Sequence, residues 1–176
     1  MKKIVLGIVY ALIALVVIFM GGAYVLPGEV VVERQITIAA PTDKVFAIVG
    51  DLKRFREFSP WAEIDPGLHY KFEGPEIGIG QKMSWASDNP QIGSGSQTVV
   101  DYQPNKRFAT TLDFGDMGKA IAYFDFSAAG TDTKVIWGFK SLLRNPLERW
   151  MGLLFDRWIG ADYEKGLAKL KTLAEK

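Results

Sequence analysis

Few side chains in this 176-residue sequence could carry out acid–base or metal chemistry. The chain has no cysteine and only one histidine, His69. Thiol catalysis, disulfides and cysteine-ligated metals are therefore excluded, and a histidine-rich metal site is impossible. A Ser-His-Asp triad would have to use His69, but no G-x-S-x-G motif accompanies it. The sequence predicts no catalytic residue, no metal and no cofactor.

Four aspartates that lie in or between expected strands are the remaining candidates for proton transfer. They are Asp101, Asp113, Asp116 and Asp125. A carboxyl group buried beside aromatic side chains has a raised pKa and could exchange a proton near neutral pH. Asp113, however, alternates with the apolar Leu112 and Phe114, which predicts that it points outward. We therefore favour a solvated outer face for these acids.

Aromatic side chains are better candidates for a binding site. Trp61, Trp85, Tyr123 and Trp137 each combine a large apolar ring with one polar atom. Ligand pockets are lined mainly by such side chains, with few polar groups. These four residues are predicted to line a pocket. Ordinary core packing is the alternative for each.

The N-terminal segment is apolar enough to span a membrane. No charged residue occurs from Ile4 to Leu26, and these 23 residues would form a helix roughly 34 Å long. A hydrocarbon core is about 30 Å thick. Lys2 and Lys3 precede the segment, and the positive-inside rule assigns that end to the cytoplasm. The sequence predicts a single-pass membrane protein with a periplasmic or extracellular domain.

A cleaved signal peptide is the alternative interpretation of this segment. Its apolar core would usually be about 7–15 residues long, which is shorter than the run observed here. Gly21 and Ala23 offer only a weak cleavage site. Because Pro27 and Gly28 end the run, we predict an anchor at residues 1–28 and one domain at residues 29–176.

The charge balance of the expected domain argues against nucleic acid as a partner. The chain has 21 Lys and Arg residues and 20 Asp and Glu residues. Without Lys2 and Lys3, 19 basic residues face the same 20 acidic ones. This balance leaves no basic field for nucleic acid and no polybasic lipid patch. The expected partners are a hydrophobic small molecule and, through Ile4–Leu26, the membrane.

Hydrophobic periodicity and turn residues predict one strand, two short helices, about six antiparallel strands and one long helix. The expected strands are Glu29–Ile38, Leu68–Phe72, Gln81–Ala86, Gly93–Tyr102, Arg107–Phe114, Lys119–Ser127 and Thr133–Lys140. An antiparallel sheet must bury one face, and only the last helix is long and apolar enough to cover it. A sheet curved around that helix predicts a cavity between them.

The last helix has a clear start signal. Asn145, Pro146 and Glu148 fit an N-cap, a first-turn proline and a capping glutamate. Glycines weaken a helix by about 1 kcal/mol each relative to alanine. We therefore expect a bend or break near Gly160.

The first half of this helix carries Trp150, Phe155 and Trp158 on more than one stripe. A wide apolar stripe is typical of deep burial. Because tryptophan also favours the membrane interface, a second hypothesis is that this segment faces the bilayer and gates ligand entry.

Several short motifs occur in an order known from one superfamily. Ile36–Ile38 followed by Ala40–Phe46 looks like its first strand and helix, and Asp51–Trp61 looks like its second helix and exit turn. Gly78–Gly80 and Gly93–Gly95 lie where its strands turn, and the long last helix matches its gripping helix. The chain resembles the SRPBCC superfamily, which includes START-like lipid-transfer domains, the major birch-pollen allergen and the polyketide cyclase/dehydrase group.

The resemblance implies an α+β helix-grip fold with a hydrophobic cavity, but it does not imply a reaction. The predicted function is a membrane-tethered domain that binds a lipid, isoprenoid or polyketide-like molecule. One alternative is a cyclase/dehydrase-type enzyme, which would need a buried acid–base pair that the sequence does not offer. A second alternative is a protein-interaction module that uses the outer surface of the fold.

Overall fold

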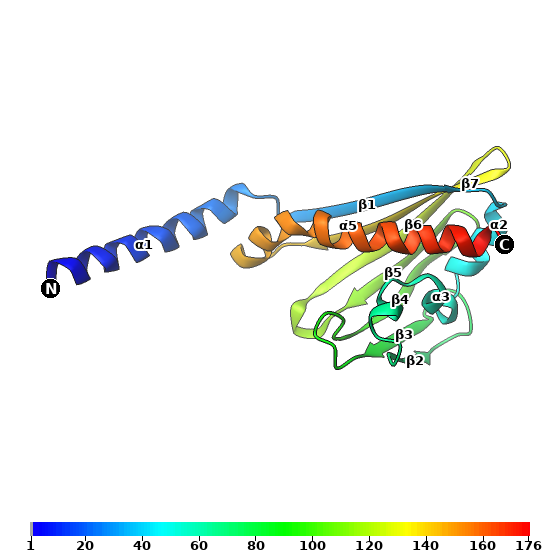
Figure 1. The fold of residues 1–176 in the computed structure, drawn as a ribbon, viewed down its shortest axis with the longest axis horizontal. Helices are drawn as coiled ribbons and strands as arrows, with labels where there is room; N and C mark the ends of the chain where they lie inside the picture. Colours follow the sequence, from blue (N-terminus) through cyan, green and yellow to red (C-terminus); the bar gives the residue numbers. More distant parts are fainter. Residues whose placement is uncertain (1) are drawn as a thin grey trace.

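A single antiparallel sheet organises the chain, and the computed structural model describes residues 2–176 of it (Figure 1). Its seven strands are β1 Glu29–Ile38, β2 His69–Glu73, β3 Lys82–Ala86, β4 Ser94–Gln103, β5 Arg107–Asp113, β6 Lys119–Ala129 and β7 Asp132–Leu142. The order in the sheet is β1-β7-β6-β5-β4-β3-β2. Every neighbour except the β1–β7 pair follows directly in sequence, which is the meander that the turn residues predict.

Helices lie before the sheet, after its first strand and at the end of the chain. They are α1 Lys2–Val25, α2 Thr42–Val49, α3 Phe55–Phe58, α4 Trp61–Ile64 and α5 Pro146–Ala174, with 3₁₀ turns η1 Leu52–Arg54 and η2 Gly115–Met117. The long helix α5 lies along β1. Helix α1 extends away from the start of β1, near the first turns of α5 (Figure 1). The predicted helix-grip architecture is confirmed.

The segment after α2 is more broken than the sequence predicts. The second short helix, expected within Asp51–Trp61, is divided into η1 and α3, and Asp51 caps η1 by accepting a hydrogen bond from the Lys53 amide at 2.9 Å. A further turn, α4, follows Pro60, whose helical backbone conformation starts it. This turn is what brings Trp61 over the sheet.

The strand register gathers four connections at one end of the sheet, which we call the α1 end. The paired positions nearest this end are Glu29–Leu142, Ala120–Ser141, Asp113–Lys119 and Ala86–Ser94. The start of β1, the turns between β3 and β4 and between β5 and β6, and the start of α5 therefore lie at the same end as α1.

The sequence predicts a bend or break near Gly160, but helix α5 runs from Pro146 to Ala174 without a break. The predicted cap is confirmed, because the Asn145 side chain accepts a hydrogen bond from the Glu148 amide at 2.9 Å. Gly160 lies directly over the guanidinium group of Arg34, which a Cβ atom would overlap. The local cost of glycine in a helix is thus offset by the close approach that it allows.

Arg34 joins α5 to the sheet through two carboxylates. It lies on the same face of β1 as Val32, and its Nη1 donates to Asp156 at 2.9 Å while its Nε donates to Glu164 at 2.7 Å. Asp156, Gly160 and Glu164 are four residues apart and therefore share one face of the helix. The guanidinium group fits between the two acids, over the bare backbone of the glycine.

The core is built around Trp137, of which only 2% is exposed. Its ring stacks on Tyr163 of α5 with centroids 4.0 Å apart, and on Phe124 of β6 at 4.7 Å. A Cβ atom at Gly166 would overlap the edge of the Trp137 ring. This glycine therefore sets how closely α5 approaches the sheet.

Replacing Gly166 with alanine tests that contact. Alanine would gain about 1 kcal/mol of helix propensity, but overpacking a core costs about 1–3 kcal/mol. We expect Gly166→Ala to lower the free energy of unfolding, as measured by urea denaturation of the detergent-solubilised chain. Gly152→Ala is the comparison on the same helix, because its Cβ would meet a terminal methyl group of Leu143 rather than the edge of a stacked ring. An unchanged or increased stability of Gly166→Ala would contradict this account of the packing.

The Arg34 contact also predicts a pH dependence. The hydrogen bonds from Arg34 hold the pKa of Asp156 below its usual value of 3.8. A lowered pKa in the folded state adds stability above the unfolded pKa, and that stability is lost as the pH falls through the folded value. We expect Asp156→Asn to be less stable than the original chain at pH 5–8, with the difference shrinking below about pH 4. Denaturant titrations over this range, with Asp162→Asn as the control on the same helix, would measure it; equal stability at neutral pH would contradict it.

Candidate ligand-binding cavity

A cavity of about 200 Å³ lies between the sheet and the segment that contains α3 and α4. On the sheet side, Met83 and Trp85 of β3 share one face because they are two residues apart. Strands β4 and β5 add Gln97 and Leu112. The full lining is Phe55, Ser59, Trp61, Leu68, Tyr70, Met83, Trp85, Gln91, Ile92, Gln97, Leu112 and Phe114.

The wall of this cavity is apolar apart from a few neutral groups, and none of these lining residues, all within the described part of the chain, is charged. Tyr70 contributes a phenol, and burial raises its pKa above the usual 10. Such a phenol stays protonated at neutral pH. The cavity therefore offers hydrogen-bond donors but no charge.

Gln97 is the buried polar group on the floor of the cavity, with 5% of its surface exposed. Its Oε1 accepts a hydrogen bond from the Thr110 hydroxyl at 3.3 Å. Its Nε2 has only the Met83 sulfur, 4.0 Å away, as an acceptor. Because a thioether is a weak acceptor, the amide retains a free donor in an apolar environment.

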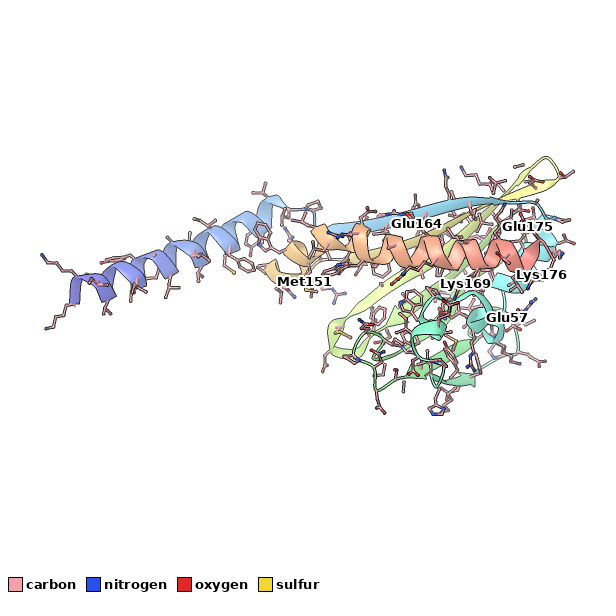
Figure 2. All side chains as sticks on the ribbon, viewed as in Figure 1. Glu57, Met151, Glu164, Lys169, Glu175 and Lys176 are labelled. Carbon is pink, nitrogen blue, oxygen red and sulfur yellow. The ribbon has the colours of Figure 1, made fainter. Side chains whose placement is uncertain are left out.

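Ser59 is a second unsatisfied polar group. Only 1% of it is exposed, and its Oγ makes no well-formed hydrogen bond among the described residues, although it lies near enough to the Tyr70 phenol to affect the pKa of that group. The residue lines the cavity and also an open groove of about 490 Å³ between α3, α4 and α5. That groove is polar and includes Glu57, Lys169 and Lys176, which are labelled in Figure 2. Ser59 therefore lies in the wall that separates the apolar cavity from the polar groove.

A smaller space of about 40 Å³ lies deeper, toward Trp137 and Tyr163. It shares Phe55, Trp61, Gln97 and Leu112 with the larger cavity. Complete burial raises the pKa of Tyr163 far above 10, so this phenol is also neutral. The shared residues make the smaller space an inward continuation of the larger one.

Three of the four aromatic residues expected at a pocket lie around these spaces. Trp61 lines both, Trp85 lines the larger cavity, and Trp137 lines the smaller one. Trp61 and Trp137 approach edge to face, with ring centroids 6.3 Å apart. The structure thus brings the three tryptophans together on one side of the sheet.

Tyr123 lies on the opposite face of the sheet, which corrects its expected place in the pocket. Its hydroxyl donates to Glu33, and the guanidinium group of Arg107 lies 4.8 Å from the centre of its ring. Desolvation and the hydrogen bond to Glu33 raise its pKa to about 12. Apolar residues occupy both phases of β6 here, and Phe124 is the one that enters the core, so Tyr123 must point outward.

The strand aspartates form ion pairs away from the cavities. Asp113 pairs with Lys119 at 2.8 Å, which confirms its predicted outward orientation, and Asp125 pairs with Arg107 at 2.6 Å. Among the described residues, no group of three or more His, Asp or Glu side chains could hold a metal ion.

Gln97 and Ser59 were not identified from the sequence as site residues. Gln97 is in phase with the buried Val99 on β4, which is a usable signal for its inward orientation. Ser59 has no such signal, because its burial depends on how α3 and α4 pack against α5.

A comparison with known protein families gives a match over nearly all residues that follow α1. A family model described as polyketide cyclase / dehydrase and lipid transport matches residues 29–175. Among curated proteins, none matches the chain.

Solved structures with the same fold include enzymes and other proteins. One domain of the di-domain ARO/CYC StfQ from the steffimycin biosynthetic pathway gives a TM-score of 0.63 at 14% identity, covering 84% of this chain and 51% of that one. Truncated norcoclaurine synthase from Thalictrum flavum gives 0.63 at 9% identity, covering 82% and 92%. Ara h 8.0201 gives 0.60 at 13% identity, covering 84% and 98%.

These identities are low enough that the likenesses show the fold alone, whereas the family model covers most of the sequence itself. The curved sheet, the long C-terminal helix and the apolar cavity agree with that match. The chain belongs to the polyketide cyclase / dehydrase and lipid transport family.

Proposed function

We propose that this protein is a membrane-tethered domain that binds a neutral, hydrophobic small molecule in the cavity beneath α3 and α4. The observation that carries the proposal is an apolar, uncharged cavity whose wall contains the weakly bonded amide of Gln97 and the buried hydroxyl of Ser59. A buried polar group without a partner costs free energy, and a bound ligand would supply the missing acceptor. Trp61, Trp85 and Trp137 would line the bound molecule.

The volume limits the size of the ligand. An apolar cavity of about 150 Å³ holds one benzene molecule, and drug-sized ligands occupy about 300–1,000 Å³. The cavity of about 200 Å³, with its continuation of about 40 Å³, lies between these values. It suits a molecule of one or two rings, or a single short chain, better than a diacyl lipid.

The polar groups define the chemistry of the ligand. The free Nε2 of Gln97 favours a carbonyl, ether or hydroxyl oxygen near the floor of the cavity. A carboxylate would be buried without an opposite charge, which is costly. The ligand class is therefore a neutral, largely apolar molecule with one oxygen acceptor.

Binding is favoured over a cyclase- or dehydrase-type reaction in the same cavity. The titratable groups that line the two spaces are Tyr70 and Tyr163, and burial raises the pKa of both. A general base needs a pKa near the working pH, and these phenols remain proton donors. No observation on the described residues specifically favours the enzyme or the protein-interaction module.

The tether in this proposal is α1, with residues 1–28 as anchor and residues 29–176 as the ligand-binding domain. The helix is long and apolar enough to cross a membrane. Lys2 and Lys3 favour a cytoplasmic N-terminus, with the domain on the periplasmic or extracellular side. Retention of α1 is supported by its contact with Trp150, which cleavage of a signal peptide would leave without its partner.

The ligand class can be tested with a matched pair of probes. Tetralone carries one carbonyl oxygen, and tetralin has nearly the same shape without it. Each would displace the neutral dye N-phenyl-1-naphthylamine from the full chain in detergent. We expect tetralone to bind about 2–10-fold more tightly, the effect of one neutral hydrogen bond.

Variants at two glutamines on the same strand provide the control. Gln97→Met should remove the preference for tetralone and retain binding of tetralin. Gln103→Met makes the same change at an exposed position of β4 and should leave both affinities unchanged. If neither probe displaces the dye, or if Gln97→Met keeps the preference, the proposed site is wrong.

The anchor is tested separately by alkaline washing of membranes. We expect the intact 19.6 kDa chain to stay in the membrane pellet. Leu12→Arg combined with Leu15→Arg should shift it to the supernatant, because each arginine near the centre of a span costs about 2.5–3.5 kcal/mol. The conservative pair Leu12→Ile and Leu15→Ile is the control. A soluble original chain, or a chain beginning after Ala23, would contradict the anchor.

A further inference from the structure

The first half of α5 carries an apolar stripe that no described residue covers. Leu147, Met151, Leu154 and Trp158 are 60%, 40%, 44% and 50% exposed. Their spacing of four, three and four residues puts them on one face of the helix. Figure 2 shows Met151 near the end of α5 that lies closest to α1. We call these four residues the α5 stripe.

Trp150, Phe155 and Trp158, which suggested that this segment faces the bilayer, differ in their contacts and do not form one surface. Phe155 packs edge to face on Phe139 of the sheet, with centroids 6.1 Å apart. Trp150 stacks on Phe19 of α1 at 5.8 Å. Only Trp158 belongs to the exposed face.

Trp150 fixes α5 to a defined level of α1. Its Nε1 donates a hydrogen bond to the Phe19 carbonyl at 3.1 Å. Its ring lies so close to Gly22 that a Cβ there would approach to 3.0 Å. The missing side chain at Gly22 thus leaves room for the Trp150 ring against α1.

Arg149 strengthens the same joint at the C-terminal end of α1. Its Nη1 donates to the carbonyl oxygens of Ala23 at 3.3 Å and Leu26 at 3.4 Å. Its guanidinium group also lies 5.6 Å from the centre of the Tyr24 ring. A cation is favourable at a helix C-terminus, where carbonyl groups lack partners. The two helices are therefore packed together rather than joined only by a loose linker.

The joint sets the depth of α5 if α1 spans the membrane. A slab of about 30 Å contains about 20 helical residues, so one that begins at Ile4 ends near Ala23. Phe19 is 15 residues beyond Ile4, or roughly 22 Å, and thus lies about 8 Å inside the slab. Trp150 contacts Phe19 and must lie at a similar depth.

We infer that the first three turns of α5 insert into the leaflet on the side of the domain, with Leu147, Met151 and Leu154 in contact with acyl chains and Trp158 near the headgroups. This inference rests on the proposed function, because it requires α1 to span. Of the charged residues in these turns, Asp156 is paired with Arg34, Arg149 is hydrogen-bonded to the end of α1, and Glu148 accepts hydrogen bonds from the Arg144 amide and the Asn145 side chain.

Insertion would bring one wall of the cavity close to the bilayer. Gln91, Ile92 and Phe114 line the cavity and belong to the turns at the α1 end of the sheet. Met117, in the turn after Phe114, is 77% exposed. A ligand dissolved in the leaflet would therefore have a short path to the cavity.

The absence of cysteine from the sequence allows a direct test with single-cysteine variants of the full chain. Met151→Cys and Leu154→Cys report on the stripe, Leu12→Cys reports on α1, and Ala168→Cys is an exposed control on the far half of α5. Each is labelled with the fluorophore NBD and reconstituted into phosphatidylcholine vesicles with or without acyl-chain nitroxide lipids. Far-UV circular dichroism would check that each variant folds.

We expect blue-shifted emission and strong nitroxide quenching at positions 12, 151 and 154, and aqueous, unquenched emission at position 168. Quenching at position 12 alone would overturn the insertion of α5 and leave the anchor intact. No quenching at position 12 would overturn the anchor itself. Blue-shifted but unquenched emission at positions 151 and 154 would assign the stripe to a second copy of the chain and overturn the inference.

Discussion

The close contact between α5 and the sheet at Gly166 is the constraint on which the rest of the structure depends. Trp137 lies between Tyr163 of α5 and Phe124 of β6, and its edge occupies the space of the missing side chain at Gly166. Nearer the start of α5, the guanidinium group of Arg34 likewise occupies the space that a side chain at Gly160 would need. These contacts fix the height of the helix above the sheet, and that height determines the space left under α3 and α4.

The two halves of α5 therefore pack in different ways. The second half of α5 is gripped by the sheet, with Leu167 and Leu170 almost fully buried. The first half leaves the core, packs Trp150 against α1 and exposes the α5 stripe. Because the helix is continuous, the position of the domain relative to α1 follows from the same packing that shapes the cavity.

Few polar groups line the cavity and its inward continuation. In this chain those groups are neutral: Gln97 on the sheet, Ser59 at the boundary with the polar groove, and two phenols. A cavity with unsatisfied donors and no charge is suited to hold a ligand in one orientation. The titratable groups in the described lining are Tyr70 and Tyr163, and burial raises the pKa of both.

Local patterns in the sequence were enough to predict the strands, the cap at Asn145 and the apolar helix at Ile4–Leu26. Each depends on residues close in the chain, where alternation, turn residues and length act directly. Tyr123 and Gly160 could not be assigned in this way, because both phases of β6 are apolar and because helix propensity is outweighed by a contact with Arg34. The burial of Ser59, the free donor of Gln97 and the pairing of Trp150 with α1 were decided only by the tertiary structure. In each case the neighbouring residues come from a distant segment of the chain. The hydrogen bonding of the side chain therefore depends on how these segments pack together.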